Sequence, residues 1–397
     1  MSARVIVTGF IGQHPLGGVT WDYVQYVTGL ARLGFDVYYF EDSGHWPYAL
    51  EGGESGEDFG VSDCRANVDY LAKVMERFGL GQRWAFRCAM DGEWSGLSDL
   101  EREEVVSSAD LLLNISSSVA RPEEYRKVPR LIFVDSDPVF TQVKLARGQA
   151  DFRAVVDAHD MHFSFGECLR APFVPETGHH WLPTRQPIVL DEWHTERSHR
   201  GVFTTVMNWA SYNPVSINGR KYGQKDIEFM RFLELPRLVE PVRLETAARG
   251  TGRRVLQDSI LHHLEHKGWS VVAPDMVCPD VESYREYIQN SMAEWSVAKN
   301  GYVEGRTGWF SCRSACYLAA GRPVVVQDTG FKEVLPTGLG LLAFSTLEEA
   351  REGIREVVSD YPRHSHAARE IAEQYFDSAK VLSHLVDRAF AVQEVAK

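Results

Sequence analysis

The sequence predicts an α/β protein built from two doubly wound domains that face each other across a cleft. Two observations support this prediction. Short apolar, β-branched runs alternate with segments of helical periodicity, and the alternation stops once, near the middle, before it resumes. With 397 residues, the chain is long enough for two domains of ordinary size. Two facing domains suit a protein that binds two substrates.

The first half begins with an apolar strand, a glycine-containing loop and a helix that Gly34 ends. The loop glycines, Gly12, Gly17 and Gly18, lack the GxGxxG spacing, so the loop is poor evidence for a dinucleotide site. A polar, Gly- and Glu-rich stretch at residues 44–60 indicates a surface loop or flap. We expect strands at residues 4–10, 36–40, 110–115, 130–134 and 161–165, and helices at residues 20–33, 65–78, 99–108 and 151–159.

The alternation breaks in a Pro-rich segment at residues 171–200 and then starts again. We expect strands at residues 203–207, 242–245, 269–273, 295–298 and 323–326, and helices at residues 224–233, 253–267, 281–290, 312–320, 347–358, 364–375 and 378–395. The predicted domains are residues 1–175, a connector at 176–200, residues 201–375, and a C-terminal helix within 376–397 that crosses back to the first domain.

Composition excludes several classes of partner. The formal charge of −13 argues against electrostatic binding to nucleic acid or to an anionic membrane. No apolar run approaches the roughly 20 residues that span a bilayer, and no signal-peptide pattern opens the chain. The six cysteines show no CxxC pair, and Cys312 and Cys316 are one helical turn apart, a spacing typical of packing. We expect a soluble, cytoplasmic protein with reduced cysteines.

A Gly- and Ser-containing run at residues 307–311 precedes the helix expected at 312–320. Free backbone N–H groups and the helix dipole make such a helix start a favourable anion site. The alternative interpretation is an ordinary βα unit with a capped helix, and loop chemistry alone leaves the two about equal.

The run AAGRPVVVQDTGFKEV at residues 319–334, together with the two α/β halves, resembles the GT-B glycosyltransferases of the group-1 kind, and a bacterial subgroup in particular. The resemblance implies two Rossmann-like domains, the second binding a nucleotide-sugar donor and the first its acceptor. It places donor-binding residues at the loop, the following helix and the segment after the next strand. These residues are Thr307, Gly308, Ser311, Arg313, Ser314, Gly330 and Glu333.

The resemblance also implies a clamp for the donor diphosphate at Arg220 and Lys225, which have the R-x4-K spacing of many such enzymes. Fixed cations that bind the departing diphosphate more tightly in the transition state lower the barrier. For an isolated pair at this spacing, a solvated basic loop is the usual alternative. The sequence departs from this family at one pair of positions. Many retaining members have two glutamates eight residues apart. Gly308 and Cys316 occupy those positions, so the stereochemical course stays open.

Transfer with inversion requires a base in the first domain. His14, in the loop after the first strand, is the leading candidate, and a solvent-exposed loop histidine is the equal alternative. Asp135 and Asp137 end a predicted strand and could orient the acceptor, act as the base or cap the next helix. Asp22, with Gly17 and Gly18, forms the acceptor-side loop, where an acid also suits the helix start.

The sequence therefore predicts a hexosyltransferase-type glycosyltransferase that uses a UDP-, dTDP- or GDP-sugar and a small-molecule or glycan acceptor. We expect no cofactor and no metal, because Arg220, Lys225 and the helix N-terminus supply positive charge. Two alternatives remain: a nucleotide-sugar epimerase of the same fold, and a non-catalytic nucleotide-sugar-binding protein. A homodimer is compatible with the sequence, which contains nothing that specifies one.

Overall fold

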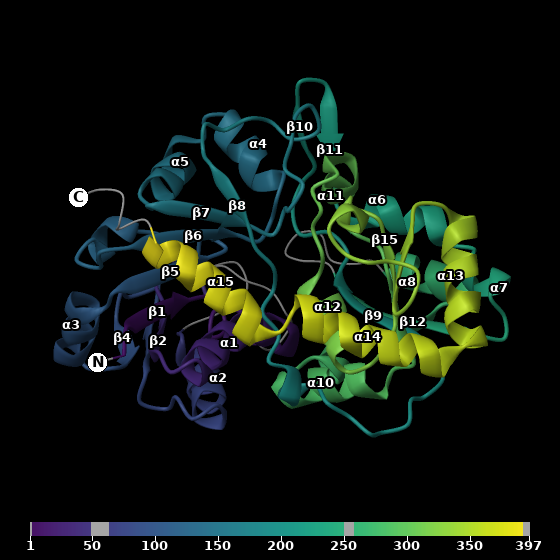
Figure 1. Cartoon of the computed structure of the whole chain (residues 1–397), viewed down its shortest axis with the longest axis horizontal. Coiled ribbons are helices and arrows are strands. Elements are labelled where there is room, and N and C mark those ends of the chain that lie inside the picture. The colour runs from purple at the N-terminus through teal and green to yellow at the C-terminus, as the bar shows by residue number, and fades with distance from the viewer. Residues whose placement is uncertain (1, 49–62, 250–257, 392–397) are drawn as a thin grey trace.

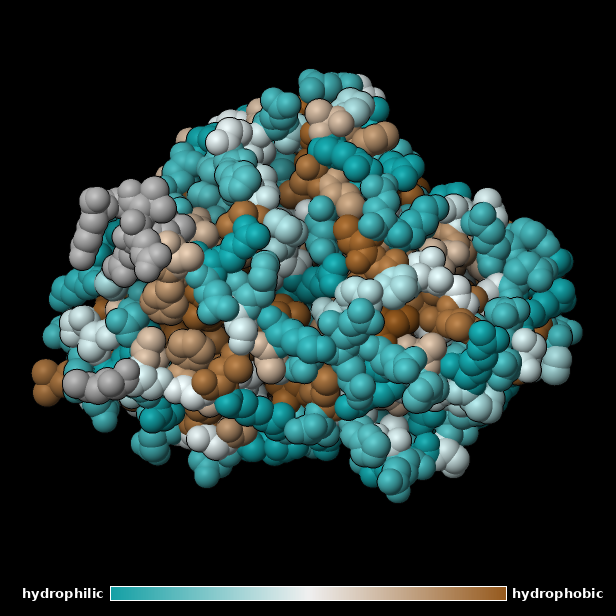
Figure 2. All heavy atoms as spheres, in the orientation of Figure 1, coloured by the Kyte–Doolittle hydropathy of each residue, from teal (hydrophilic) through white to brown (hydrophobic). Residues whose placement is uncertain are grey.

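The computed structural model describes residues 2–48, 63–249 and 258–391, which form two α/β lobes side by side (Figure 1). Most of the predicted flap at residues 44–60, the start of the helix expected at 253–267 and the end of the last expected helix lie outside the described residues. In the described residues no helix is long and apolar enough to cross a membrane. Hydrophilic side chains cover most of the face seen in Figure 2.

The first lobe is built on an eight-stranded sheet of order β4-β3-β2-β1-β5-β6-β7-β8, parallel except for β4 against β3. Its central strands are apolar and almost entirely buried, because helices cover both faces. The strands are β1 (Arg4–Thr8), β2 (Asp36–Glu41), β3 (Trp84–Arg87), β4 (Trp94–Gly96), β5 (Leu111–Ile115), β6 (Leu131–Asp135), β7 (Met161–Ser164) and β8 (Trp181–Pro183).

Five helices flank this sheet. A capping box formed by Ser98 and Glu101 explains why the third of them begins at the residue expected from the sequence. The helices are α1 (Gly17–Arg32), α2 (Arg65–Arg77), α3 (Asp99–Ser108), α4 (Phe140–Ala146) and α5 (Ala150–Asp157). Among the residues that the structure describes, 3-10 helices lie in the connections of this lobe at Pro122–Tyr125 and Leu190–Glu192.

The second lobe has a six-stranded parallel sheet of order β13-β12-β9-β14-β15-β16. In β15, Val324 and Val326 pack into one apolar core and Val325 into another, so the strand is buried on both faces. The strands are β9 (Val202–Asn208), β12 (Arg243–Arg249), β13 (Ser270–Val272), β14 (Ala293–Ser296), β15 (Val324–Gln327) and β16 (Leu341–Phe344). A separate hairpin pairs β10 (Val215–Ile217) with β11 (Arg220–Tyr222).

The helices that follow in the chain surround the second sheet, except for the last one. They are α6 (Lys225–Phe229), α7 (Leu235–Leu238), α8 (Asp258–His266), α9 (Pro274–Val277), α10 (Val281–Asn290), α11 (Asn300–Gly305), α12 (Cys312–Ala319), α13 (Leu347–Ser359), α14 (Tyr361–Tyr375) and α15 (Ser378–Ala391). Short 3-10 helices lie at Met230–Phe232 and Phe331–Glu333.

The chain crosses between the lobes twice, and the two crossings are hydrogen-bonded to each other. The Ile188 N–H donates to the carbonyl of Phe376 at 2.7 Å, and the Ser378 N–H donates to the carbonyl of Ile188 at 2.9 Å. Beyond the second crossing, α15 returns to the first lobe and packs on α1 (Figure 1). A Cβ at Gly29 of α1 would lie 2.5 Å from Leu382 Cδ1, so this contact is close.

Two expectations differ from the structure. Residues 181–183 belong to the predicted connector but form β8, so the first sheet extends past residue 175. The expectation that all six cysteines are reduced is wrong for one pair, because Cys64 and Cys88 form a disulfide. They are 24 residues apart in sequence, and the β2–α2–β3 unit brings the start of α2 next to the end of β3. The other four cysteines form no disulfide and are buried.

Candidate functional site

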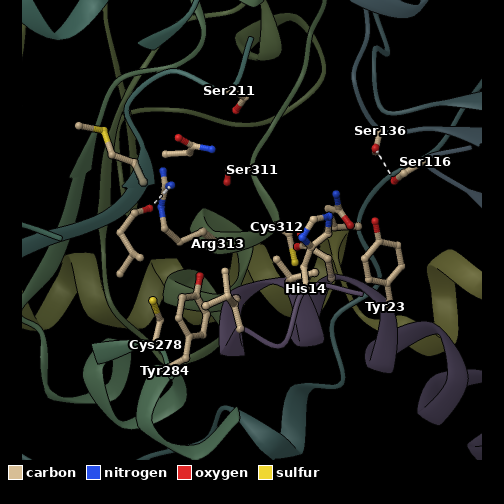
Figure 3. A pocket seen from close by; sticks show the side chains of 18 of the residues that line it. His14, Tyr23, Ser116, Ser136, Ser211, Cys278, Tyr284, Ser311, Cys312 and Arg313 are labelled. Atoms are coloured by element: carbon tan, nitrogen blue, oxygen red, sulfur yellow. Dashed lines mark hydrogen bonds between the residues drawn. The ribbon is translucent and has the colours of Figure 1, made fainter. Parts of the chain in front are cut away.

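A cavity of about 500 Å³ lies where the carboxyl ends of the two sheets face each other, and side chains of both lobes converge on it (Figure 3). The first lobe contributes the loops after β1, β5, β6 and β7, and the second lobe contributes the end of β9 and the start of α12. The residues used below are His14, Gly18, Asp22, Tyr23, Ser116, Ser136, Ser211, Lys225, Tyr284, Ser311, Cys312 and Arg313.

The loop after β1 is held by the buried carboxylate of Glu41. This carboxylate accepts hydrogen bonds from the backbone N–H groups of Gly12 (2.7 Å) and Gln13 (2.9 Å) and from the Tyr39 hydroxyl (2.6 Å). Asn67 of α2 donates to the Gly12 carbonyl at 2.8 Å. These four bonds fix the backbone next to His14, and His14 lines the cavity.

His14 is held among aromatic rings, 5.8 Å from Phe10 and 5.5 Å from Tyr48 between ring centroids. Burial, with a smaller effect of His45, lowers the pKa of His14 to about 4. The imidazole is therefore neutral at pH 7 and retains a lone pair that can accept a proton.

The start of α12 faces the cavity from the second lobe. Ser311 is its N-cap residue, and its hydroxyl makes no capping hydrogen bond, so the first N–H groups of the helix keep their capacity to bind an anion. Gly308, just before it, has φ of +75°, and a Cβ there would lie 2.8 Å from Cys168 Sγ. Glycine is therefore required at the turn that directs the chain into this helix.

Arg313 enters the cavity wall from the first turn of α12. It donates to Glu294 at 2.6 Å, to the Val206 carbonyl at 2.7 Å and to Ser296 at 2.9 Å, so its guanidinium is fixed in place. Burial acts to lower the pKa of Arg313, but the Glu294 carboxylate outweighs it and the net shift is upward. These bonds use three of the five N–H groups of its guanidinium.

Lys225, the first residue of α6, also lines the cavity. In the described part of the chain its ammonium makes no hydrogen bond or ion pair. Burial, followed by the charges of Arg313 and Lys299, holds the pKa of Lys225 well below its usual value. A bound anion would favour the charged form, because it would add negative charge next to the ammonium.

Asp22 of α1 lines the cavity on the first-lobe side. Burial raises the pKa of Asp22 to about 6, although Cys312, Arg313 and Lys225 act in the opposite direction. It is the carboxylate of this wall that faces the two cations.

Several predicted site residues lie elsewhere. Arg220 is exposed on the β10–β11 hairpin, with its guanidinium 5.1 Å from the centre of the Phe173 ring, and it is not among the described residues that line the cavity. Arg220 and Lys225 are therefore not neighbours on one surface. Arg220 begins the extended strand β11, and Lys225 begins the helix α6. Glu333 forms ion pairs with Arg170 (2.5 Å) and Arg306 (3.3 Å) at the surface.

The remaining predicted residues are also absent from the lining of the main cavity. Thr307, Gly308 and Ser314 do not line the main cavity, and Ser314 and Thr307 are buried. Gly17 begins α1 and lies against α10, where a Cβ would be 2.0 Å from the Asp280 carbonyl oxygen, so it is not available to an acceptor. Asp135 and Asp137 line a second cavity that adjoins the first.

Sequence reasoning missed several residues of the main cavity, namely Tyr23, Ser116, Ser136, Ser211, Tyr284 and Cys312. The serines had a usable signal, since Ser116 and Ser136 directly follow the buried strands β5 and β6. No group of three metal-ligating side chains occurs in the residues that the structure describes.

The sequence matches none of the protein-family models and none of the curated proteins with which it was compared. Solved structures do match over nearly the whole chain. An α-glucosyltransferase in complex with UDP and a 13-mer DNA has 11% identity and a TM-score of 0.58, with 98% of this chain and 100% of the other covered. Anabaena HepE in complex with UDP has 10% identity and a TM-score of 0.56, covering 97% and 99%.

This chain has the GT-B glycosyltransferase fold. The fold also occurs in a putative UDP-N-acetylglucosamine 2-epimerase from Listeria monocytogenes, which is 11% identical with a TM-score of 0.50 and covers 100% of this chain and 98% of the other. The predicted fold class, two facing doubly wound α/β halves of GT-B type, is confirmed. At this level of identity the likeness concerns the fold alone.

Proposed function

We propose that this protein is a glycosyltransferase that moves a sugar, of the hexosyl type, from a nucleoside diphosphate to an acceptor hydroxyl. The observation that carries the proposal is that one cavity has two cationic side chains and a helix N-terminus on one wall and a half-buried, neutral histidine on the other. Lys225, Arg313 and the start of α12 form the first wall, and His14 belongs to the second. The UDP bound in two structures of the same fold supports a nucleotide-sugar donor.

The donor diphosphate binds in this proposal against Lys225, Arg313 and the N–H groups that follow Ser311. As the bond between the anomeric carbon and the diphosphate oxygen breaks, negative charge grows on the diphosphate. Cations and helix N–H groups already fixed in position stabilise that charge without reorganisation. Because these groups supply the positive charge, we propose a metal-independent reaction with no cofactor.

His14 acts in this proposal as the general base. Its free ring nitrogen takes the proton of the acceptor hydroxyl while that oxygen bonds to the anomeric carbon and the nucleoside diphosphate departs. The first lobe, with Gly18 and Asp22 at the cavity wall, then binds the acceptor, and the second lobe binds the donor. This assignment follows the domain limits predicted from the sequence, extended to include β8.

A donor panel with one variant and one matched control tests the proposal. We expect one family among UDP-, GDP- and dTDP-sugars to raise the melting temperature, and slow release of the free nucleoside diphosphate in the absence of acceptor. Lys225→Ala should weaken donor binding by about tenfold or more, because it removes a charge contact to the diphosphate. Arg220→Ala, the exposed partner of the R-x4-K spacing, should leave donor binding unchanged. Binding of no donor would overturn the proposal.

A nucleotide-sugar epimerase is the second candidate, since the Listeria structure shares the fold. Incubation with the selected donor without acceptor separates the two. An epimerase returns a nucleotide sugar of changed configuration, whereas a transferase returns free nucleoside diphosphate and free sugar. Nuclear magnetic resonance of the anomeric protons distinguishes these products.

A further inference from the structure

A second cavity of about 440 Å³ adjoins the first on the first-lobe side and shares Tyr23, Ser116, Ser136 and Ser211 with it. It lies over the carboxyl ends of β5 and β6 and reaches α4 and α11. Its other lining residues include Asp135, Asp137, Lys144, Phe152, Lys299 and Tyr302. It is large enough for a substituent of a small ligand whose reacting end lies in the main cavity.

Asp135, one of two carboxylates in this wall, is fully engaged by the protein. One oxygen accepts from the Asp137 N–H at 3.0 Å and from the Thr141 hydroxyl at 2.7 Å. The other accepts from Gln142 at 3.0 Å and from the Ser164 hydroxyl at 2.8 Å. A carboxylate offers about four acceptor positions, so Asp135 has none left for a ligand.

Asp137, the second carboxylate, is matched by the charge of Lys299, with their atoms 2.7 Å apart. The hydroxyls of Tyr212 and Tyr302 also donate to it. Burial would raise its pKa, but Lys299 and these hydrogen bonds hold the pKa of Asp137 below its usual value. Asp137 and Lys299 therefore neutralise each other across the two lobes.

Lys144 of α4 differs from both. Its ammonium lines the cavity, and in the described residues it makes no hydrogen bond or ion pair. Its Nζ lies over the ring of Phe152, 5.0 Å from the ring centre. Three N–H donors and one positive charge are thus free for a ligand, next to a carboxylate pair that cannot compete for it.

Serine hydroxyl groups line the second cavity where it adjoins the main cavity. Ser116 and Ser117 follow β5 with φ of +61° and +60°, a conformation that is costly for serine and that concentrates at functional sites. The Ser116 and Ser136 hydroxyls are 2.6 Å apart and lie in both cavities (Figure 3).

We infer that the second cavity binds an anionic group, a phosphate or a carboxylate, carried by the acceptor substrate. Lys144 is the cation that holds it, by charge-assisted hydrogen bonds, and the serine hydroxyls line the path along which the acceptor reaches the main cavity. The inference rests on the proposed function and narrows it, because a neutral sugar would leave the ammonium of Lys144 without a counter-charge in this cavity.

Calorimetric titration of the full chain tests the inference, at a saturating concentration of whichever of UDP, GDP or dTDP the donor panel selects. That nucleotide occupies the diphosphate wall and removes it as a competing anion site. The probes are glucose 6-phosphate, glucuronate and glucose. Glucose 6-phosphate, glucuronate or both should bind about tenfold or more tighter than glucose. Tighter binding of glucose 6-phosphate identifies the anionic group as a phosphate, and tighter binding of glucuronate identifies it as a carboxylate. Equal binding of all three, or no binding by either anion, would overturn the inference.

Three variants locate the binding. Lys144→Gln should lower the affinity for the preferred anion about tenfold while leaving glucose and UDP affinity unchanged, and Lys144→Arg should restore it because the charge returns. Lys127→Gln, at an exposed lysine before β6, is the matched control and should change nothing. Unchanged anion affinity in Lys144→Gln contradicts the inference. Failure of UDP, GDP and dTDP alike to bind the unaltered protein instead contradicts the proposed function.

Discussion

At the scale of single residues, the cavity combines groups whose protonation is set by burial. Lys225 and His14 are both shifted toward their neutral forms, and Asp22 is shifted toward its protonated form. Such opposed shifts in one cavity are typical of sites that bind charge or transfer protons. An incoming diphosphate would favour the charged form of Lys225, because it would place negative charge next to the ammonium.

His14→Ala tests the general base. We expect kcat to fall about a hundredfold or more, which is the usual contribution of a positioned base, with UDP affinity unchanged. In the unaltered protein the pKa of about 4 means that His14 stays deprotonated, so kcat/KM should hold as the pH falls to about 5 and decline only near 4. The pH profile of transfer and the matched variant His45→Gln check this. A full rate in His14→Ala assigns the base elsewhere.

At the scale of elements, the loop between β1 and α1 depends on one buried carboxylate, and this gives a prediction for stability. Burial raises the pKa of Glu41 to about 7, above the ordinary 4.5, despite its hydrogen bonds with Tyr39, Gly12 and Gln13. The folded state therefore holds the Glu41 proton more tightly than the unfolded state. Stability should fall by up to about 3 kcal/mol as the pH rises from 4.5 through 7.

Urea unfolding between pH 4 and 8 measures this effect, and Glu41→Gln should remove the Glu41 part of the pH dependence. The amide also cannot accept from two backbone N–H groups on different atoms, so the variant should lose about 1–3 kcal/mol at low pH. Glu104→Gln, at an exposed glutamate, serves as the control. The same pH slope in Glu41→Gln and in the unaltered protein contradicts the assignment.

Elements with strong periodicity or buried apolar runs were predicted well from the sequence, and short ones were not. Helices α3 and α10 have the bounds expected from the pattern, because each has a polar N-cap residue and a clear end. Strands β3, β4 and β8 were missed, since strands of three or four residues at or near a sheet edge carry little alternation.

The same division holds for the site. Lys225, Ser311 and Arg313 were predicted from a linear motif and do line the cavity, as do His14, Gly18 and Asp22. Arg220 does not line the cavity with Lys225, because it belongs to the β10–β11 hairpin, which spacing along the chain does not reveal. Tyr284 and Lys144 reach the cavities through tertiary packing, and no local pattern marks them.

At the scale of the whole molecule, the lobes pack closely on both sides of the cavity. One continuous apolar core includes residues of β1 and α1 together with Tyr284 and Ile288 of α10. Glycines permit the closest approaches: a Cβ at Gly17 would lie 2.0 Å from the Asp280 carbonyl oxygen, and one at Gly301 would lie 2.4 Å from Phe140 Cζ. The shape of the cavity therefore depends on the close packing of the two lobes at Gly17 and Gly301.

Gly17→Ala is expected to force α1 and α10 apart, because its new methyl group meets backbone and not a movable side chain. We expect a loss of about 1–3 kcal/mol in the free energy of unfolding, together with weaker donor binding, as the facing wall is displaced. Gly18→Ala is the matched control, since its Cβ would meet only the Tyr284 ring, at 3.1 Å. Calorimetric unfolding and donor titration measure both, and equal behaviour of the two variants would contradict the expectation.

The paired chain crossings at Ile188 and residues 376–378 have a mechanical consequence. Because the two segments are joined by backbone hydrogen bonds, the lobes share one narrow two-stranded hinge. Rotation about that hinge changes the backbone dihedrals of a few residues and leaves both sheets intact. The helix α15 remains fixed to the first lobe and moves with it. A rotation of this kind that separates α1 from α10 would widen the gap between His14 and α12.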